Sequence, residues 1–483
     1  MKLHQLLYNI DMKTGLSPDF TNTEVHGIAD NSIDVQEGYV FVAIQGFSSD
    51  GHEFIEDAIK KGASLIIGEQ DLGNLSAHYI QVANSRKALG IIAQNFYGDP
   101  AKHKLVIGVT GTNGKTTTSY MLKHILESNG KSCSVIGTIQ NVINGMKTPS
   151  FNTTPSSLVL HKLLSLSNDE VIIMEVSSHG LSQYRIEGIS FDYCLFTNLH
   201  HEHLDYHGSM EDYFQAKLLL FEKLKTSGIA IVNTDDSWGE KLADTLLNEG
   251  KKVYRIGKSS ESQLRIADFD LRSSTAAVEE SNEFSTVFSS MDGIHNMYNT
   301  VMAFGTAILV GISKECILQS LPQFEGVEGR FEIAKQSNGS TVIVDYAHTP
   351  DAISHCLITA KQLGAKRIIH VFGFRGNRDP SKRQEMMTIT AGLSDQYILT
   401  LDDLNSVPAS EMIESFIYLN DIYGNEKGCI ISDRTLAIKK AITESQLGDW
   451  ILITGKGHEQ YQQRYQLPTE SDRDTVQYLA KPK

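Results

Sequence analysis

The feature that most constrains the fold is a glycine-containing stretch between a predicted strand and a predicted helix. The apolar run over residues 104–109 predicts a buried strand, and the pattern over residues 115–129 predicts a helix. Between them the chain reads Gly111-Thr-Asn-Gly114-Lys115-Thr116. A turn of this kind belongs to a parallel α/β sheet, and its glycines let backbone N–H groups approach phosphate oxygens at the helix N-terminus. The stretch therefore predicts an α/β sheet with a phosphate-binding loop at one edge.

The loop carries the side chains that a nucleoside triphosphate requires. Lys115 would neutralise charge on the β- and γ-phosphates, and the Thr116 hydroxyl would be a ligand of Mg²⁺. The general pattern GxxxxGK[ST] is not met, because Val109 occupies its first glycine position. The loop alone therefore leaves kinases, ATPases, GTPases and ligases open.

Length and pattern predict three α/β domains. At roughly 100–200 residues per domain, 483 residues suggest about three. Alternating strand and helix patterns predict a small N-terminal α/β domain over residues 1–100, which ends in a turn-rich stretch. A central P-loop-type domain with a mostly parallel sheet follows over residues 101–330. A C-terminal Rossmann-like sheet is predicted for residues 331–483.

Composition narrows the functional class. The formal net charge of -15 argues against broad nucleic-acid binding, although a local basic site for an anionic small molecule fits an acidic protein. The five cysteines lie far apart without a CxxC pair, which favours a reducing compartment. We find neither a signal-peptide pattern nor a run of about 18 apolar residues that would predict a membrane span. A soluble, cytoplasmic protein is expected.

The predicted central domain holds a second group of polar residues. Glu175 follows an apolar strand, a position that suits a further Mg²⁺ ligand, and four histidines lie within residues 200–207. The histidines fit a zinc site, a Mg²⁺-nucleotide site or a purely structural cluster; zinc is disfavoured because no cysteine and no HExxH motif lies nearby. Lys217 follows on a helical pattern, and by spacing alone it is a surface lysine.

Motifs in a fixed order extend along nearly the whole chain. They are the stretch 108–118, Asn152-Thr-Thr-Pro155, Glu175-Val-Ser-Ser-His179, Asp205-Tyr-His-Gly208, Gly329-Arg330, Asp345-Tyr-Ala-His348, Gly376-Asn-Arg-Asp379 and Gly455-Lys-Gly-His-Glu459. Together they resemble the Mur ligase family, and in particular its members that add the third peptide residue to UDP-N-acetylmuramoyl-L-Ala-D-Glu during peptidoglycan precursor synthesis. The resemblance implies a three-domain, monomeric, ATP- and Mg²⁺-dependent ligase that binds no nucleic acid.

The resemblance also implies a mechanism. ATP phosphorylates the carboxylate of the UDP-muramoyl peptide, and the amine of the incoming amino acid attacks the acyl phosphate to give amide and phosphate. Catalysis is expected from Lys115, Glu175, His203 and a carbamylated Lys217, with metal ligands at Thr116, Glu175, His203 and Lys217.

Substrate contacts are implied residue by residue. For ATP these are Gly111, Thr112, Asn113, Gly114, Lys115, Thr116, Thr117, Asn296, Asn299, Arg330, Asp345 and His348; turn and capping roles are the alternative for the last five. For the UDP-linked substrate they are Ser32, Asn152, Thr153, Thr154, Ser177, Gln183 and Arg185. Arg185 suits a phosphate or a carboxylate.

The identity of the amino acid is read from the predicted C-terminal domain. Arg378, Gly455 and Glu459 match positions that contact the incoming amino acid. Relatives that use diaminopimelate carry Asp-Asn-Pro-Arg where this chain has Asp402-Asp403-Leu404-Asn405. Without an arginine at 405, a second carboxylate would lose a bidentate partner. We therefore expect L-lysine rather than diaminopimelate, with Asp402 or Asp403 facing the side-chain ammonium; ornithine or a neutral residue stays open.

Further departures leave a second enzyme hypothesis open. Asn31-Ser32-Ile33 stands where the family pattern has Asp-Ser-Arg, Glu202 stands where Asp is usual, and Gly373-Phe-Arg-Gly376 introduces Arg375, a potential anion contact. The alternative is a paralogue that joins an amine to a different carboxylate in a side pathway. A non-catalytic nucleotide-binding regulator is disfavoured because the expected catalytic residues are present.

Overall fold

The computed structural model describes residues 1–14, 22–46, 49–72 and 78–481. They form two compact units. The first unit comprises residues 1–110, 131–195 and 216–230, and the second comprises residues 111–130, 196–215 and 231–483. The predicted boundaries at residues 100 and 330 stay a prediction. Within the described ranges, no helix is long and apolar enough to cross a membrane.

A four-stranded parallel sheet forms the start of the first unit. Its strands, in the order β1-β2-β3-β4, are Gly27–Ala29, Tyr39–Val42, Leu65–Gly68 and Tyr79–Gln81. Three α-helices accompany it: α1 (Leu3–Leu6), α2 (Ile55–Lys60) and α3 (Ser85–Phe96). Successive residues of β2 pack into different hydrophobic cores. Val40 and Val42 pack into one core, and Phe41 packs into the other. Burial on both faces explains the continuous apolar runs seen in the sequence.

An eleven-stranded sheet has the order β15-β14-β13-β12-β11-β10-β5-β9-β6-β7-β8. In chain order its strands are β5 (Leu105–Thr110), β6 (Cys133–Ile136), β7 (Gln140–Ile143), β8 (Met146–Pro149), β9 (Val171–Glu175), β10 (Phe191–Phe196), β11 (Leu224–Asn233), β12 (Lys252–Gly257), β13 (Leu264–Asp270), β14 (Thr275–Glu280) and β15 (Glu283–Phe288). The helices of this region are α4 (Lys115–Ser128), α5 (Ser157–Leu166), α6 (Ser178–Ser182), α7 (Leu204–His207), α8 (Met210–Glu222), α9 (Ser237–Asn248), α10 (Ile294–Leu309) and α11 (Lys314–Ser320).

The interior of this sheet confirms the predicted fold class, since β5 and β6 both pair in parallel with β9. Its ends differ from the expectation, because β7 with β8 and β13 with β14 and β15 are antiparallel. Ser281 and Asn282, both with positive φ, form the two-residue turn between β14 and β15. Such a turn is typical of a hairpin and is the sequence signal that was missed.

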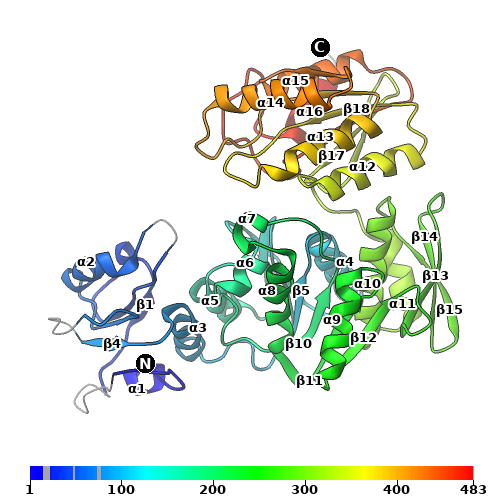
Figure 1. The fold of residues 1–483 in the computed structure, drawn as a ribbon. Coiled ribbons are helices and arrows are strands. Elements are labelled where there is room, and N and C mark those ends of the chain that lie inside the picture. Colours follow the sequence, from blue (N-terminus) through cyan, green and yellow to red (C-terminus); the bar gives the residue numbers. More distant parts are fainter. Residues whose placement is uncertain (15–21, 47–48, 73–77, 482–483) are drawn as a thin grey trace. The chain divides into compact units, whose positions relative to one another are not determined.

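A six-stranded sheet completes the second unit (Figure 1). Its order is β16-β17-β21-β18-β19-β20, with bounds Glu332–Lys335, Thr341–Asp345, Asp449–Thr454, Arg367–Phe372, Gln396–Leu399 and Gly428–Ile430. Only the β16–β17 pairing is antiparallel. Its helices are α12 (Pro350–Gln362), α13 (Ser381–Leu393), α14 (Ala409–Tyr423), α15 (Arg434–Glu444) and α16 (Asp472–Ala480).

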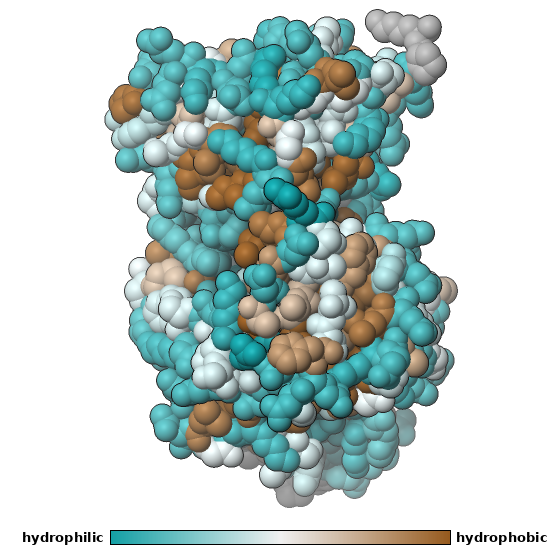
Figure 2. Space-filling view, turned by 90° about the vertical axis from the view of Figure 1, so that its right-hand side faces the viewer, coloured by the Kyte–Doolittle hydropathy of each residue, from teal (hydrophilic) through white to brown (hydrophobic). Residues whose placement is uncertain are grey.

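Helices cover both faces of the six-stranded sheet. Residues of α12, α13 and α14 pack against one face, and residues of α15 and α16 pack against the other. Because β17, β21, β18 and β19 are parallel neighbours, the loops that follow them lie at one edge. This is where open α/β sheets bind ligands. On the face of the molecule in Figure 2, hydrophilic residues predominate and hydrophobic ones form scattered patches.

Candidate active site

The phosphate loop is held in a shape that only glycine permits at two positions. Gly111 has a φ of +146°, and a Cβ there would lie 1.9 Å from Thr197 Oγ1. Gly114, the N-cap of α4, has a φ of +85°, and its Cβ would lie 2.3 Å from Asn299 Oδ1. The Lys115 ammonium donates to the carbonyls of Gly111 and Thr112 at 2.8 and 2.9 Å. The lysine therefore curls over the loop at the positive end of a helix, an arrangement that fits a polyphosphate.

Neighbouring segments of the second unit fix this loop. The Asn113 N–H donates to Asn198 Oδ1 at 2.9 Å, and Arg330 Nη2 donates to Thr116 Oγ1 at 3.3 Å. Asn299 Nδ2 donates to Asn296 Oδ1 at 3.3 Å. The structure thus gathers most of the expected ATP-binding residues, and Thr117 is buried beside them on α4.

Asp345 is the last residue of β17, and His348 lies in the loop that follows it. The Asp345 carboxylate accepts the Phe331 and Ala347 N–H groups, each at 2.6 Å, which is a turn role. Burial raises the pKa of the Asp345 carboxyl, against the opposing charge of Arg330. Burial, helped by the charge of Arg375, holds the pKa of His348 well below its ordinary value, so its imidazole is neutral. ATP contact by these two residues stays a prediction.

Glu175 ends β9 in the first unit with a fully buried side chain. Its carboxylate accepts the Thr138 N–H at 3.1 Å and the Thr138 hydroxyl at 2.7 Å. A Cβ at Gly137 would lie 2.2 Å from Glu175 Oε1, so the sequence leaves room for this carboxylate. Carboxylate oxygens such as those of Glu175 are donors that Mg²⁺ prefers, and metal binding by Glu175 and by Thr116 stays a prediction.

Lys217 differs from the surface lysine that spacing suggested, because only 1% of it is exposed on α8. Burying a charged lysine costs free energy, which interactions of the ammonium or the loss of its charge can offset. His203 lies in the left-handed region, with a φ of 58°, directly before α7. Carbamylation of Lys217 and metal binding by either residue stay predictions.

The other histidines of residues 200–207 have separate partners. His200 lies 3.6 Å from Asp351, His201 lies 3.6 Å from Asp379, and His207 stacks on Tyr213. In the part of the chain that the structure describes, no three His, Cys, Asp or Glu side chains group closely enough to hold a metal ion. Each of these three histidines therefore has an acidic or aromatic partner, and the choice between a structural and a metal-binding role stays open.

Five of the residues expected at the UDP-linked substrate form one network in the first unit. The Thr154 hydroxyl accepts the Ser177 N–H and donates to the Glu175 carbonyl, both at 3.0 Å. Arg185 donates to the Thr154 carbonyl at 2.7 Å and to Gln183 Oε1 at 2.9 Å. Thr153 lies 3.1 Å from the Thr138 hydroxyl, and Asn152 is exposed before it. Ser32 instead lies beside the four-stranded sheet, in the 3-10 helix η2 (Ser32–Asp34).

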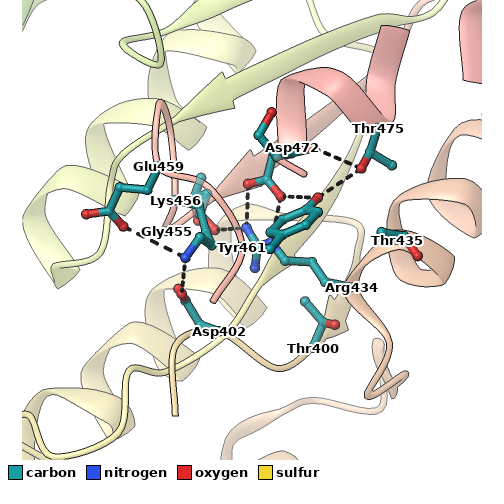
Figure 3. Close-up of polar contacts among 12 residues, drawn as sticks. Thr400, Asp402, Arg434, Thr435, Gly455, Lys456, Glu459, Tyr461, Asp472 and Thr475 are labelled. Carbon is teal, nitrogen blue, oxygen red and sulfur yellow. Dashed lines mark hydrogen bonds and ion pairs between the residues drawn. The ribbon is translucent and has the colours of Figure 1, made fainter. Parts of the chain in front are cut away.

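The expected amino-acid residues surround one lysine that sequence reasoning had not singled out. Lys456 lies 2.5 Å from Asp403, 3.9 Å from Asp402 and 4.0 Å from Glu459. Figure 3 shows Lys456 between Asp402 and Glu459, next to Gly455. A Cβ at Gly455, whose φ is +113°, would lie 2.5 Å from Asp402 Oδ2, so glycine lets the loops after β21 and β19 approach.

Asp402 stays ionised in this cluster. Burial acts to raise its pKa, but the positive charges of Arg375, Arg434 and Lys456 outweigh burial and lower the pKa. Both acidic residues expected to face a substrate ammonium therefore have a cationic partner within the chain. Two other expected residues lie at the margin: Arg378 is exposed, and Asn405 Nδ2 donates to the Gly376 carbonyl at 3.0 Å.

Two buried residues support the cluster and were also missed. Arg434 pairs with Asp472 through two hydrogen bonds of 2.7 Å (Figure 3). Arg434 also donates to the Thr454 carbonyl at 2.8 Å. Arg434 begins α15 and Asp472 begins α16, so nothing local in the sequence links them. The signal for Lys456, by contrast, was its place inside the motif of residues 455–459.

Comparisons with known proteins cover the same regions. The Mur ligase family catalytic domain matches residues 24–97, the Mur ligase middle domain matches 109–307, and the Mur ligase glutamate ligase domain matches 329–457. The phosphate loop and Glu175 thus lie in the middle-domain match, and Arg375 and Lys456 lie in the glutamate ligase match.

Individual relatives extend over most of the chain. The UDP-N-acetylmuramoyl-L-alanyl-D-glutamate–2,6-diaminopimelate ligase of Clostridium botulinum is 38% identical over 448 residues, which is 91% of each chain. The ligase of that name from Fusobacterium nucleatum is 40% identical over 452 residues, 90% of this chain and 89% of that one. A solved structure with the same name is similar with a TM-score of 0.69 and 27% identity, covering 99% of each chain.

Proposed function

This chain belongs to the Mur ligase family, and we propose that it extends UDP-N-acetylmuramoyl-L-Ala-D-Glu by 2,6-diaminopimelate. It is an ATP-dependent, ADP-forming ligase of peptidoglycan synthesis that adds an amino acid to a UDP-muramoyl dipeptide. The observation that supports the proposal most is the relation to diaminopimelate ligases over about nine-tenths of the chain. Because ATP and the UDP-linked peptide belong to the cytoplasmic nucleotide pool, we propose the cytoplasm as its site of action.

L-Lysine, which the sequence favours, is the second candidate. Its support is Asn405, which cannot supply the guanidinium that a second carboxylate would bind. The relatives lend lysine no support, since their names give diaminopimelate. Its proposed recognition by acidic residues is also weakened, because Lys456 already lies 2.5 Å from Asp403 and 3.9 Å from Asp402.

The chemistry follows from two obstacles. A carboxylate is a poor electrophile, and it repels the γ-phosphate that must activate it. Lys115 and the N-terminus of α4 counter this repulsion at the phosphate loop. Mg²⁺ would supply the remaining charge neutralisation, held by Thr116 and Glu175 together with His203 and carbamylated Lys217. The amine then attacks the acyl carbon, and phosphate leaves with one former carboxylate oxygen.

A different acidic substrate has one observation in its favour. Ile33 is 75% exposed at the position where the family pattern has an arginine near the uridine. An exposed apolar side chain cannot replace an arginine as a partner for an anion. A paralogue acting on another carboxylate therefore stays the alternative for the acid.

One assay tests these proposals together. Phosphate release is measured with ATP, UDP-N-acetylmuramoyl-L-Ala-D-Glu and, in turn, meso-diaminopimelate, L-lysine and L-ornithine, and reactions lacking either cosubstrate are the controls. We expect release only when the dipeptide and diaminopimelate are both present. If, of the three amines, only lysine gives phosphate release with the dipeptide, then lysine rather than diaminopimelate is the amino acid added. If no amine gives release, the dipeptide is not the substrate.

A further inference from the structure

Arg375 lies among the loops that follow β18, β19 and β21, where the amino acid is expected to bind, although the family pattern gave this residue no role. It lies in the loop after β18, and its Nη2 donates to the Gly455 carbonyl at 2.7 Å. The same nitrogen lies 2.5 Å from Glu459 Oε2. Its Nη1 donates to the Tyr346 hydroxyl at 3.3 Å, and its guanidinium carbon lies 5.0 Å from the centre of the Tyr346 ring. Arg375 therefore contacts both Gly455 and Glu459, which are expected to bind the amino acid.

The charges of this cluster are divided between a closed interior and an accessible edge. Lys456 and Asp402 have side chains that are 1% and 0% exposed, and Asp403 is 9% exposed. Glu459 and Arg375 are the more accessible pair, with side chains that are 28% and 12% exposed. A ligand that reaches this cluster thus meets one carboxylate and one guanidinium side by side.

Arg375 also retains hydrogen-bonding capacity. Its Nε is buried and has no hydrogen-bond partner among the residues that the structure describes. Buried donors normally have partners, and a guanidinium presents its donors as a planar fork that matches a carboxylate. Because 12% of the Arg375 side chain is exposed, a carboxylate that entered beside Glu459 would meet the edge of this guanidinium.

We propose that Arg375 binds the second carboxylate of a diamino dicarboxylic acid, in place of the arginine that is absent at position 405. The far end of such an acid is a zwitterion, so its ammonium pairs with Glu459 while its carboxylate pairs with Arg375. A lysine side chain offers only an ammonium, which Arg375 repels. This assignment rests on the proposed ligase function and explains how a chain with Asn405 accepts the substrate of its relatives.

The test compares meso-diaminopimelate and L-lysine as substrates of Arg375→Gln at saturating ATP and UDP-dipeptide. A lost charged hydrogen bond of about 1.5–3 kcal/mol corresponds to a rise in KM of about tenfold to 150-fold. We expect that rise for diaminopimelate with little change in kcat, and no comparable rise for lysine. Arg367→Gln, at the other end of β18, is the matched control and should leave both KM values unchanged.

Further variants separate binding from positioning. Asn405→Arg, added to Arg375→Gln, should lower the KM for diaminopimelate again, because it returns a guanidinium to the family position. Arg375→Lys keeps the positive charge but lacks the planar fork. Its KM for diaminopimelate should lie between those of the unaltered protein and Arg375→Gln. The urea midpoint of each variant is measured as well. If Arg375→Gln does not fold, the KM values of Arg375→Lys for the two amino acids decide the question.

Each contrary outcome has a distinct meaning. An equal rise in KM for both amino acids would make Arg375 a positioning residue for Glu459 and overturn the assignment. An unchanged KM for diaminopimelate would overturn it as well. Turnover of lysine but not diaminopimelate by the unaltered protein would refute the assignment while the ligase function stands, whereas no turnover with any amine would refute both.

Discussion

The buried ion pair of Arg434 and Asp472 supports the loops that are expected to bind the amino acid. Both side chains are 0% exposed and share two hydrogen bonds of 2.7 Å. Asp472→Asn removes the negative charge and leaves a buried guanidinium. Breaking a buried pair costs about 3–5 kcal/mol. Asp402, whose charge also acts on Arg434, compensates in part, so we expect a loss near the lower end, about 3 kcal/mol of unfolding free energy.

Urea unfolding measures this loss through Trp450, which lies on β21 and is 7% exposed. The only other tryptophan, Trp238, is replaced by Phe in all variants so that the signal reports the six-stranded sheet. The double variant Arg434→Leu, Asp472→Leu removes both charges and should lose less stability than Asp472→Asn alone. Two results would refute the reasoning. One is a loss of unfolding free energy below about 1 kcal/mol for Asp472→Asn, and the other is a loss in the double variant that equals the sum of the losses of Arg434→Leu and Asp472→Leu alone.

Three further outcomes are expected. Gly114→Ala should abolish measurable ATP binding in calorimetry, because the φ of +85° and a Cβ 2.3 Å from Asn299 Oδ1 distort the loop; retained affinity would contradict the loop assignment. Lys217→Ala should abolish turnover but largely spare substrate binding, and near-normal turnover would remove Lys217 from the mechanism. Burial lowers the pKa of His295 and His370 to about 3, so both lose protons on folding. The stability they contribute is present above about pH 6.5 and is lost as pH falls toward 3; urea midpoints that do not fall with pH across this window would contradict their neutral burial.

Local motifs were readable from the sequence because their chemistry lies in adjacent residues. Residues 111–116 predicted the turn before α4, and the apolar strand before Glu175 predicted that this carboxylate lies at a strand end. The helical pattern around Lys217 could not reveal its burial, because helical spacing gives the direction of a side chain but not what covers it. Resemblance to the family, rather than periodicity, pointed to this residue.

The charge pairs among the loops after β18, β19 and β21 could not be predicted without knowing the order of the strands in the sheet. Arg375 and Glu459 are 84 residues apart and meet only because β18 and β21 are parallel neighbours. Lys456 likewise reaches Asp403 from the loop after β21. Sequence reasoning therefore assigned Asp402 and Asp403 to the substrate without seeing the internal cation that pairs with them. The expectation that L-lysine is the amino acid added arose because the pairing of Lys456 with these carboxylates was not foreseen, and because Asn405 replaces an arginine.

We propose that the chain activates a carboxylate as an acyl phosphate at the loop of residues 111–116. The direct measurement uses UDP-N-acetylmuramoyl-L-Ala-D-Glu carrying ¹⁸O in the reacting carboxylate, with ATP and meso-diaminopimelate, and analyses the released phosphate by mass spectrometry. We expect one ¹⁸O atom in each phosphate formed, because the bridging oxygen leaves with phosphorus when the amine attacks. Phosphate without ¹⁸O, formed together with the amide product, would contradict an acyl phosphate and the mechanism built on it.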